Sequence, residues 1–136
     1  MRKAAIIMAD FNETFNDFNN TEDTTTQFDP NDIQQNKVMS IFAYLSWLVL
    51  VPIFGAKNSP FARFHINQGL VLAIVEIACW VVFGILGHVP GIRWIAYLAE
   101  SAVSVVCVVF SVIGIVNAAS GRAKELPIVG SFRILK

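Results

Sequence analysis

Three apolar runs dominate the chain after residue 37. They cover residues 38–54, 66–86 and 94–116, and each carries few or no charged side chains. A helix that spans a bilayer needs about 17–25 predominantly apolar residues, and these runs are apolar on nearly every face rather than along one stripe. The pattern therefore predicts an all-α integral membrane bundle with three transmembrane helices.

Proline and glycine positions mark the expected helix ends. Pro30 and Pro60 each follow a residue that can cap a helix N-terminus, Asp29 and Ser59. Gly91, after a proline, predicts the turn between the second and third helices, and Ser120-Gly121 predicts the end of the third. The expected transmembrane helices cover about residues 38–54, 60–86 and 92–119, followed by a short interfacial C-terminal segment.

The first 36 residues differ from the rest in being acidic and rich in Asn and Thr, and residues 19–27 contain no apolar side chain. Such a segment buries too little surface to offset its ordering entropy, so we expect a disordered N-terminal tail. Phe11, Phe15 and Phe18 share one helical face, which leaves open a short amphipathic helix on a membrane or a partner. The expected organisation is a tail at residues 1–36 and a membrane domain at residues 37–136.

Composition and charge favour a membrane location. Of the 136 residues, 55% are hydrophobic and 15% are charged, whereas soluble domains carry about 25% charged residues. The net charge of zero combines an acidic tail with a basic body, whose Lys and Arg residues gather after the first and third runs. Because cytoplasmic flanks carry the excess of Lys and Arg, we expect a multi-pass plasma-membrane protein with a cytoplasmic C-terminus and an external tail.

Two acidic residues lie within the predicted spans. Glu76 is near the middle of the second span, where it costs about 3 kcal/mol. Ionisable residues at that depth face the bundle interior and mark functional sites by default. A neutral carboxyl that only specifies packing is the alternative. Glu100, the second candidate, lies closer to the outer interface, where solvation favours a structural role.

A stripe of small and polar residues recurs every three or four positions on the third predicted helix. Such a stripe allows close helix approach in a membrane, so it favours a packing seam over a polar path. Besides Glu100, the seam consists of Tyr97, Ser104, Cys107, Ser111 and Gly114.

A polar, basic cluster joins the cytoplasmic ends of the second and third predicted helices. It is either an interfacial collar that contacts lipid phosphates or a docking surface for a segment of another protein. The cluster consists of Arg63, His65, Asn67, Gln68, Asn117 and Arg122.

Catalytic and metal chemistry is not expected. The sequence has no CxxC, HExxH, Walker or GxGxxG motif, and His65 and His88 would lie about 34 Å apart along one helix. Basic residues are too scattered to bind nucleic acid. We expect no enzyme activity, no catalytic residue, no cofactor and no metal site. The expected partners are the lipid bilayer and either a second copy of the chain or another membrane protein.

Two segments resemble a known membrane family. SPFARFHINQG (residues 59–69) and GIVNAASGRAKELPIVGSFRIL (residues 114–135) are similar to bacterial relatives of the twenty-kilodalton protein-import component of the chloroplast inner envelope. The resemblance covers about residues 37–136. It implies an all-α membrane protein and, by analogy, a part of a polypeptide-conducting pore or its assembly. The plastid protein has four membrane helices, one more than we expect here.

Two other functions stay open. One is a small-solute or proton-linked transporter that uses Glu76, and the other is an accessory or regulatory subunit without transport activity. A transporter often shows an internal repeat, which this sequence lacks. That absence favours the classes that act through binding.

Overall fold

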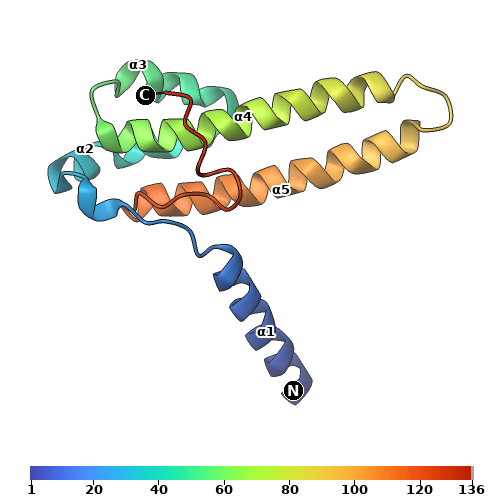
Figure 1. The fold of residues 1–136 in the computed structure, drawn as a ribbon, viewed down its shortest axis with the longest axis horizontal. Helices are drawn as coiled ribbons and strands as arrows, with labels where there is room; N and C mark the ends of the chain where they lie inside the picture. The colour runs from blue at the N-terminus through green and yellow to red at the C-terminus, as the bar shows by residue number, and fades with distance from the viewer. Residues whose placement is uncertain (136) are drawn as a thin grey trace.

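The computed structural model describes residues 1–135, and Lys136, the end of the expected interfacial segment, lies outside them. The described residues form five α-helices and two short 3₁₀ helices (Figure 1), which confirms the all-α class. In chain order these are α1 (Arg2–Phe18), η1 (Thr25–Gln27), α2 (Pro30–Phe42), η2 (Ser46–Val49), α3 (Leu50–Gly55), α4 (Pro60–Leu86) and α5 (Arg93–Ala119).

The helices α4 and α5 form a long antiparallel hairpin (Figure 1), and their bounds agree with the second and third helices expected from the sequence. Ser59 caps α4 by accepting a hydrogen bond from the Ala62 N–H at 3.0 Å, and Pro60 occupies the first turn. Gly91 has a φ of 92° in the connecting turn, a conformation that glycine adopts without steric cost.

Among residues 1–135, two helices rather than three are long and apolar enough to cross a membrane. The most apolar windows of α4 and α5 have mean hydropathies of 2.5 and 2.4, and only 17% and 33% of these windows is buried inside the protein. A core helix of a soluble protein would be mostly buried. The exposed apolar side chains cover the half of the hairpin next to its turn, which suits a lipid environment; they include Ile74, Ile77, Trp80, Ile85, Trp94, Leu98 and Val105.

The expected transmembrane helix at residues 38–54 is wrong. The run is divided among the end of α2, a turn, η2 and α3, and the longest of these helices, α2, has 13 residues. Ala43, Tyr44 and Val49 are buried in the hydrophobic core, whereas Trp47 and Phe54 are exposed. The run is therefore apolar in part because it supplies the core, and its length does not indicate a span.

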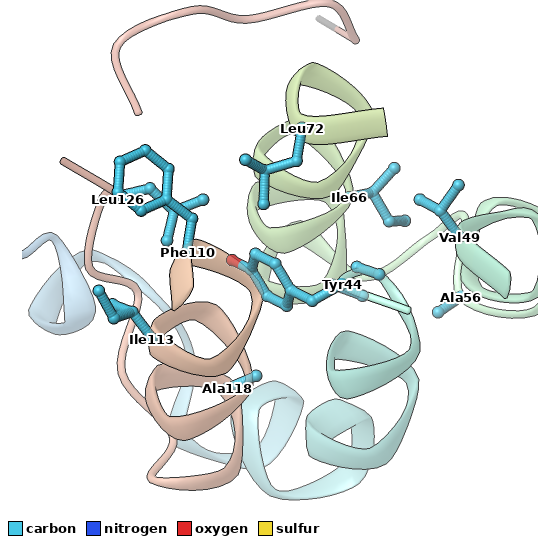
Figure 2. Packing of buried hydrophobic residues seen from close by; sticks show 11 residues of the cluster. Tyr44, Val49, Ala56, Ile66, Leu72, Phe110, Ile113, Ala118 and Leu126 are labelled. Atoms are coloured by element: carbon cyan, nitrogen blue, oxygen red, sulfur yellow. The ribbon is translucent and has the colours of Figure 1, made fainter. Parts of the chain in front are cut away.

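The core lies at the end of the hairpin opposite the turn, where α2, η2 and α3 pack against it (Figure 1). Tyr44 follows α2 and reaches across to α5 (Figure 2). Two glycines permit this packing. A Cβ atom at Gly114 would lie 2.5 Å from Tyr44 Cζ, and one at Gly69 would lie 2.6 Å from the Ala43 carbonyl carbon.

The N-terminal tail has defined elements in place of the expected disorder. Its first helix, α1, contains no buried residue and projects away from the hairpin (Figure 1). The linker after α1 is tied to the segment after α5, because the Thr24 N–H donates to the Ala123 carbonyl and the Glu125 N–H to the Glu22 carbonyl, each at 3.0 Å. The tail and the C-terminal segment therefore share one end of the hairpin, whereas the sequence predicted a tail on the opposite side of the membrane.

Candidate functional site

The predicted polar cluster holds the chain's own C-terminal segment, residues 121–135, against α4. His65 and Gln68 have no exposed surface, and Asn67 is 4% exposed. Their hydrogen-bond partners are mainly backbone groups of the C-terminal segment. We call these three side chains and the segment that they bind the C-terminal clamp.

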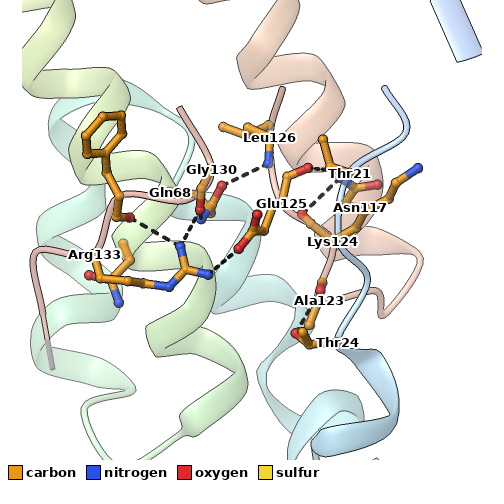
Figure 3. A network of polar contacts seen from close by, with 12 residues as sticks. Thr21, Thr24, Gln68, Asn117, Ala123, Lys124, Glu125, Leu126, Gly130 and Arg133 are labelled. Atoms are coloured by element: carbon orange, nitrogen blue, oxygen red, sulfur yellow. Dashed lines mark hydrogen bonds and ion pairs between the residues drawn. The ribbon is translucent and has the colours of Figure 1, made fainter. Parts of the chain in front are cut away.

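The side-chain amides of Asn67 and Gln68 each donate to a backbone carbonyl and accept from a backbone N–H of the C-terminal segment. Gln68 Nε2 donates to the Gly130 carbonyl at 2.8 Å, and Gln68 Oε1 accepts from the Leu126 N–H at 2.9 Å (Figure 3). Asn67 Nδ2 donates to the Leu135 carbonyl at 3.0 Å, and its Oδ1 accepts from the Ile134 N–H at 3.0 Å. These bonds satisfy backbone groups of a segment that forms no helix of its own.

His65 connects the start of α4 to the C-terminal segment and to Tyr44. Its Nε2 lies 2.9 Å from the Arg122 carbonyl oxygen, which can only accept, so Nε2 carries the proton. Its Nδ1 lies 2.6 Å from the Tyr44 hydroxyl, which donates to the neutral ring. Burial raises the pKa of the Tyr44 phenol well above its usual range, so this donor stays protonated. Nothing in the sequence distinguishes Tyr44 from the apolar residues around it.

The other members of the polar cluster divide between the interior and the surface. Asn117 is 4% exposed, and its Nδ2 lies 3.5 Å from the Lys124 carbonyl. The Arg122 side chain is exposed, and so is that of Arg63, which borders a pocket of about 440 Å³ beside Lys57. The buried amides and His65 therefore serve the clamp, while the two arginines stay at the surface.

Two further contacts at this end of the hairpin have no signal in the sequence pattern. Arg133 forms an ion pair with Glu125 at 2.7 Å (Figure 3). Asp32 of α2 accepts hydrogen bonds from the Ser59 hydroxyl at 2.6 Å and the Phe61 N–H at 3.0 Å. A carboxylate there also complements the positive end of the α4 dipole, so α2 is joined to the first turn of α4.

Glu76 and Glu100 line one pocket of about 240 Å³ between α4 and α5, together with Ser104. Glu76 also borders a second pocket of about 410 Å³, whose lining includes Cys107 and Ser111. Glu76 is exposed and Glu100 is partly exposed. We call this surface the carboxylate groove. No group of three or more His, Cys, Asp or Glu side chains that could hold a metal ion occurs in the described part of the chain.

The predicted packing seam on α5 is divided by the fold. Cys107 and Gly114 are buried against the chain's own core, and Ser111 is partly buried. Tyr97 and Ser104 are exposed. Of the exposed and partly buried residues, Ser104 and Ser111 line the pockets of the carboxylate groove, and Tyr97 does not.

Residues 35–135 match the magnetosome magnetite crystal formation protein family, MamF/MmsF. The chain belongs to this family. It is 34% identical to the magnetosome protein MmsF of Paramagnetospirillum magneticum over 94 residues, which cover 68% of this chain and 79% of MmsF. It is 31% identical to the magnetosome protein MamF of Magnetospirillum gryphiswaldense over 93 residues, which cover 68% of this chain and 77% of MamF. No solved structure matches the chain.

Membership of the MamF/MmsF family corrects the resemblance to the plastid import component. Both segments behind that resemblance, residues 59–69 and 114–135, lie within the matched region. They form the start of α4, the end of α5 and the C-terminal segment. Their buried polar side chains His65 and Gln68 stabilise the tertiary structure and do not indicate a pore. The import function and the alternative of a Glu76 transporter are therefore wrong. The accessory or regulatory subunit stays a prediction.

Proposed function

We propose that this protein acts in magnetite crystal formation as a membrane protein of the magnetosome. The match over residues 35–135 carries the proposal, because this region includes the whole hairpin, most of α2 and the clamp. The names of the relatives, the magnetosome proteins MmsF and MamF, support a location in the magnetosome membrane. That the chain is no enzyme, carries no cofactor and binds no nucleic acid stays a prediction.

The proposal includes a topology in which α4 and α5 both cross the bilayer and both termini lie on the cytoplasmic side. The distribution of Lys and Arg supports this orientation. The turn end of the hairpin carries Arg93, whereas the opposite end carries Lys37, Lys57, Arg63, Arg122, Lys124 and Arg133. On the far side the protein then presents only the turn at residues 87–92 and the adjacent ends of the two helices.

The carboxylate groove supports a contact with another membrane helix, from a second copy or a different protein. An ionisable side chain that faces lipid costs about 3 kcal/mol at mid-membrane, and Glu76 is exposed on this hairpin. A helix that covers the groove would remove Glu76 from lipid. The Ser104 hydroxyl, which lines the same groove, could form a hydrogen bond with that helix. We expect Ser104→Leu to reduce self-association in vesicles, measured by energy transfer between labelled copies. Val105→Leu, at a position 62% exposed, is the control, and equal effects would contradict this contact.

Complementation tests the role in crystal formation. The chain is expressed in a Paramagnetospirillum magneticum strain that lacks MmsF, and electron microscopy measures the size and shape of the magnetite crystals. We expect the chain to reach the magnetosome membrane and to shift the crystals toward those of the parent strain. Immunoblots of isolated magnetosomes provide the control for abundance. Normal abundance with unchanged crystals would contradict the proposal, and so would exclusion of the chain from magnetosomes.

A further inference from the structure

The N-terminal helix α1 carries an apolar face that is largely uncovered within residues 1–135. Ile7, Phe11, Phe15 and Phe18 follow one another at intervals of four, four and three residues, so they share one side of the helix. Ile7 is 66% exposed and Phe11 is 67% exposed. The rings of Phe11 and Phe15 stack with centroids 6.2 Å apart. Most of the stability of a helix in a protein comes from packing of its amphipathic face, so we expect this exposed face of α1 to meet an apolar environment.

The opposite face of α1 is mostly polar and carries Glu13, Asn16 and Asp17, with Ile6 as its exposed apolar member. The whole helix has two basic and three acidic residues, a formal charge of minus one. A helix divided in this way is typical of segments that lie in a membrane interface, with the apolar face in the acyl boundary. Because the net charge is slightly negative, the apolar area rather than attraction to anionic headgroups has to supply the binding.

The fold holds α1 at the level of the membrane. The Phe18 ring packs against the Phe110 ring of α5 with centroids 6.0 Å apart. Phe110 lies nine residues before the end of α5, about 13 Å along the helix, and its neighbours Val106 and Val109 are exposed. In Figure 1, α1 leaves the side of α5 at a steep angle to the hairpin. The apolar face of α1 thus continues the lipid-exposed surface of α5.

We propose that α1 lies in the interface of the bilayer that α4 and α5 cross, on the side of the termini, with its Phe side chains among the lipid chains. Lipid is the occupant of this face because the face begins at Phe18 on the exposed flank of a spanning helix. The helix lies outside the region that matches the magnetosome family. The proposal rests on the hairpin crossing the bilayer and is independent of the role in crystal formation.

Site-directed spin labelling of the full chain tests the proposal. The protein carries Cys79→Ala and Cys107→Ala, is reconstituted in phosphatidylcholine vesicles, and receives one nitroxide label at Ile7→Cys or Asn16→Cys, which face opposite sides of α1. Collision rates are measured with oxygen, which concentrates in lipid, and with a water-soluble nickel chelate. Because the apolar face of an interfacial helix sits about 5–10 Å into the headgroup and acyl boundary, we expect an oxygen-to-nickel ratio about tenfold higher at position 7 than at position 16. Equal access of nickel to both labels would overturn the proposal. Shielding of the position 7 label from both reagents would also overturn it, because it would show a protein on this face.

Two double variants of matched charge test which face of α1 binds the membrane. Phe11→Glu with Phe15→Glu places two carboxylates on the apolar face, and Asn12→Glu with Asn16→Glu places two beside or on the polar face. With the label at Ile7→Cys, we expect only the first pair to lose the high oxygen-to-nickel ratio. Neither pair threatens the core, because α1 contributes no buried residue. The ratio should also persist when a quarter of the lipid is phosphatidylglycerol and in high salt. Equal effects of the two pairs, or a ratio that requires anionic lipid, would refute binding through the apolar face.

Discussion

Replacing Gly69 with alanine tests the close approach of the end of α2 to α4. A Cβ atom at this position would lie 2.6 Å from the Ala43 carbonyl carbon and closer still to its oxygen. Ordinary contacts between carbon and carbonyl oxygen are about 3.3–3.6 Å, so the two segments have to move apart. The backbone of α4 fixes the position of the added Cβ, and the atoms it meets belong to the Ala43 backbone, so no side-chain rotation can relieve the clash.

The expected effect on the free energy of unfolding combines three contributions. Alanine in a helix interior gains about 1 kcal/mol over glycine, whereas overpacking costs about 1–3 kcal/mol. Moving Ala43 also displaces Tyr44 and its hydrogen bond to the buried His65, which costs about 1–3 kcal/mol more. The net expectation is a loss of about 3 kcal/mol. Gly84, where an added Cβ would meet no other atom within 4 Å, is the control, and Gly84→Ala should gain up to about 1 kcal/mol.

The buried thiol of Cys107 reports unfolding. Its residue is 7% exposed, so in a Cys79→Ala background a thiol-reactive fluorophore labels Cys107 only when heating opens the detergent-solubilised protein. We expect a lower midpoint temperature for Gly69→Ala and an equal or higher one for Gly84→Ala. A Gly69→Ala midpoint at or above that of the parent would refute the contact between α2 and α4.

The clamp and the tail provide three further tests. Gln68→Leu leaves the buried Leu126 N–H without a partner and removes one of two donors to the Gly130 carbonyl, the other being Arg133. We expect a loss of about 1–3 kcal/mol in the same thiol assay; an unchanged midpoint would argue against the clamp. Tyr44→Phe removes only the hydroxyl that donates to His65 and should lower the free energy of unfolding by about 1–2 kcal/mol. An unchanged midpoint temperature for this variant would show that the hydrogen bond does not form. Asp23→Cys with Lys124→Cys, in a chain without native cysteines, should form an intrachain disulfide on mild oxidation, because the two residues pair as an antiparallel bridge. Recovery of reduced chain alone on non-reducing gels would contradict the attachment of the tail.

The hairpin follows from signals that are local in the chain. Capping by Ser59, the proline at position 60 and the glycine turn at position 91 each act within a few residues, and the structure places the ends of α4 and α5 where these signals predict them. The run at residues 38–54 has a similar composition but a different outcome. Its apolar side chains are shared between the core and the surface, and hydropathy does not distinguish burial in protein from burial in lipid.

The sequence also did not indicate which groups the polar residues of the clamp bind. Their positions predicted that His65, Asn67 and Gln68 belong together, and the structure brings them together. Their partners are mainly backbone groups of residues 122–135. Because every residue carries a backbone carbonyl, the sequence does not show which carbonyl a side chain will bind. A lipid collar and a docking surface were therefore the alternatives, and the segment that docks is the chain's own C-terminal segment.

By itself, the sequence determined the all-α class, the two long helices of the hairpin and the residues that form its polar end. These properties depend on neighbours in the chain, through hydropathy, helix capping and turn formation. Only the tertiary structure decided that the first apolar run packs as core, that the tail joins the C-terminal segment, and that Glu76 and Glu100 border one groove. Each of these outcomes depends on contacts between groups far apart in the chain, whose free energy depends on three-dimensional proximity.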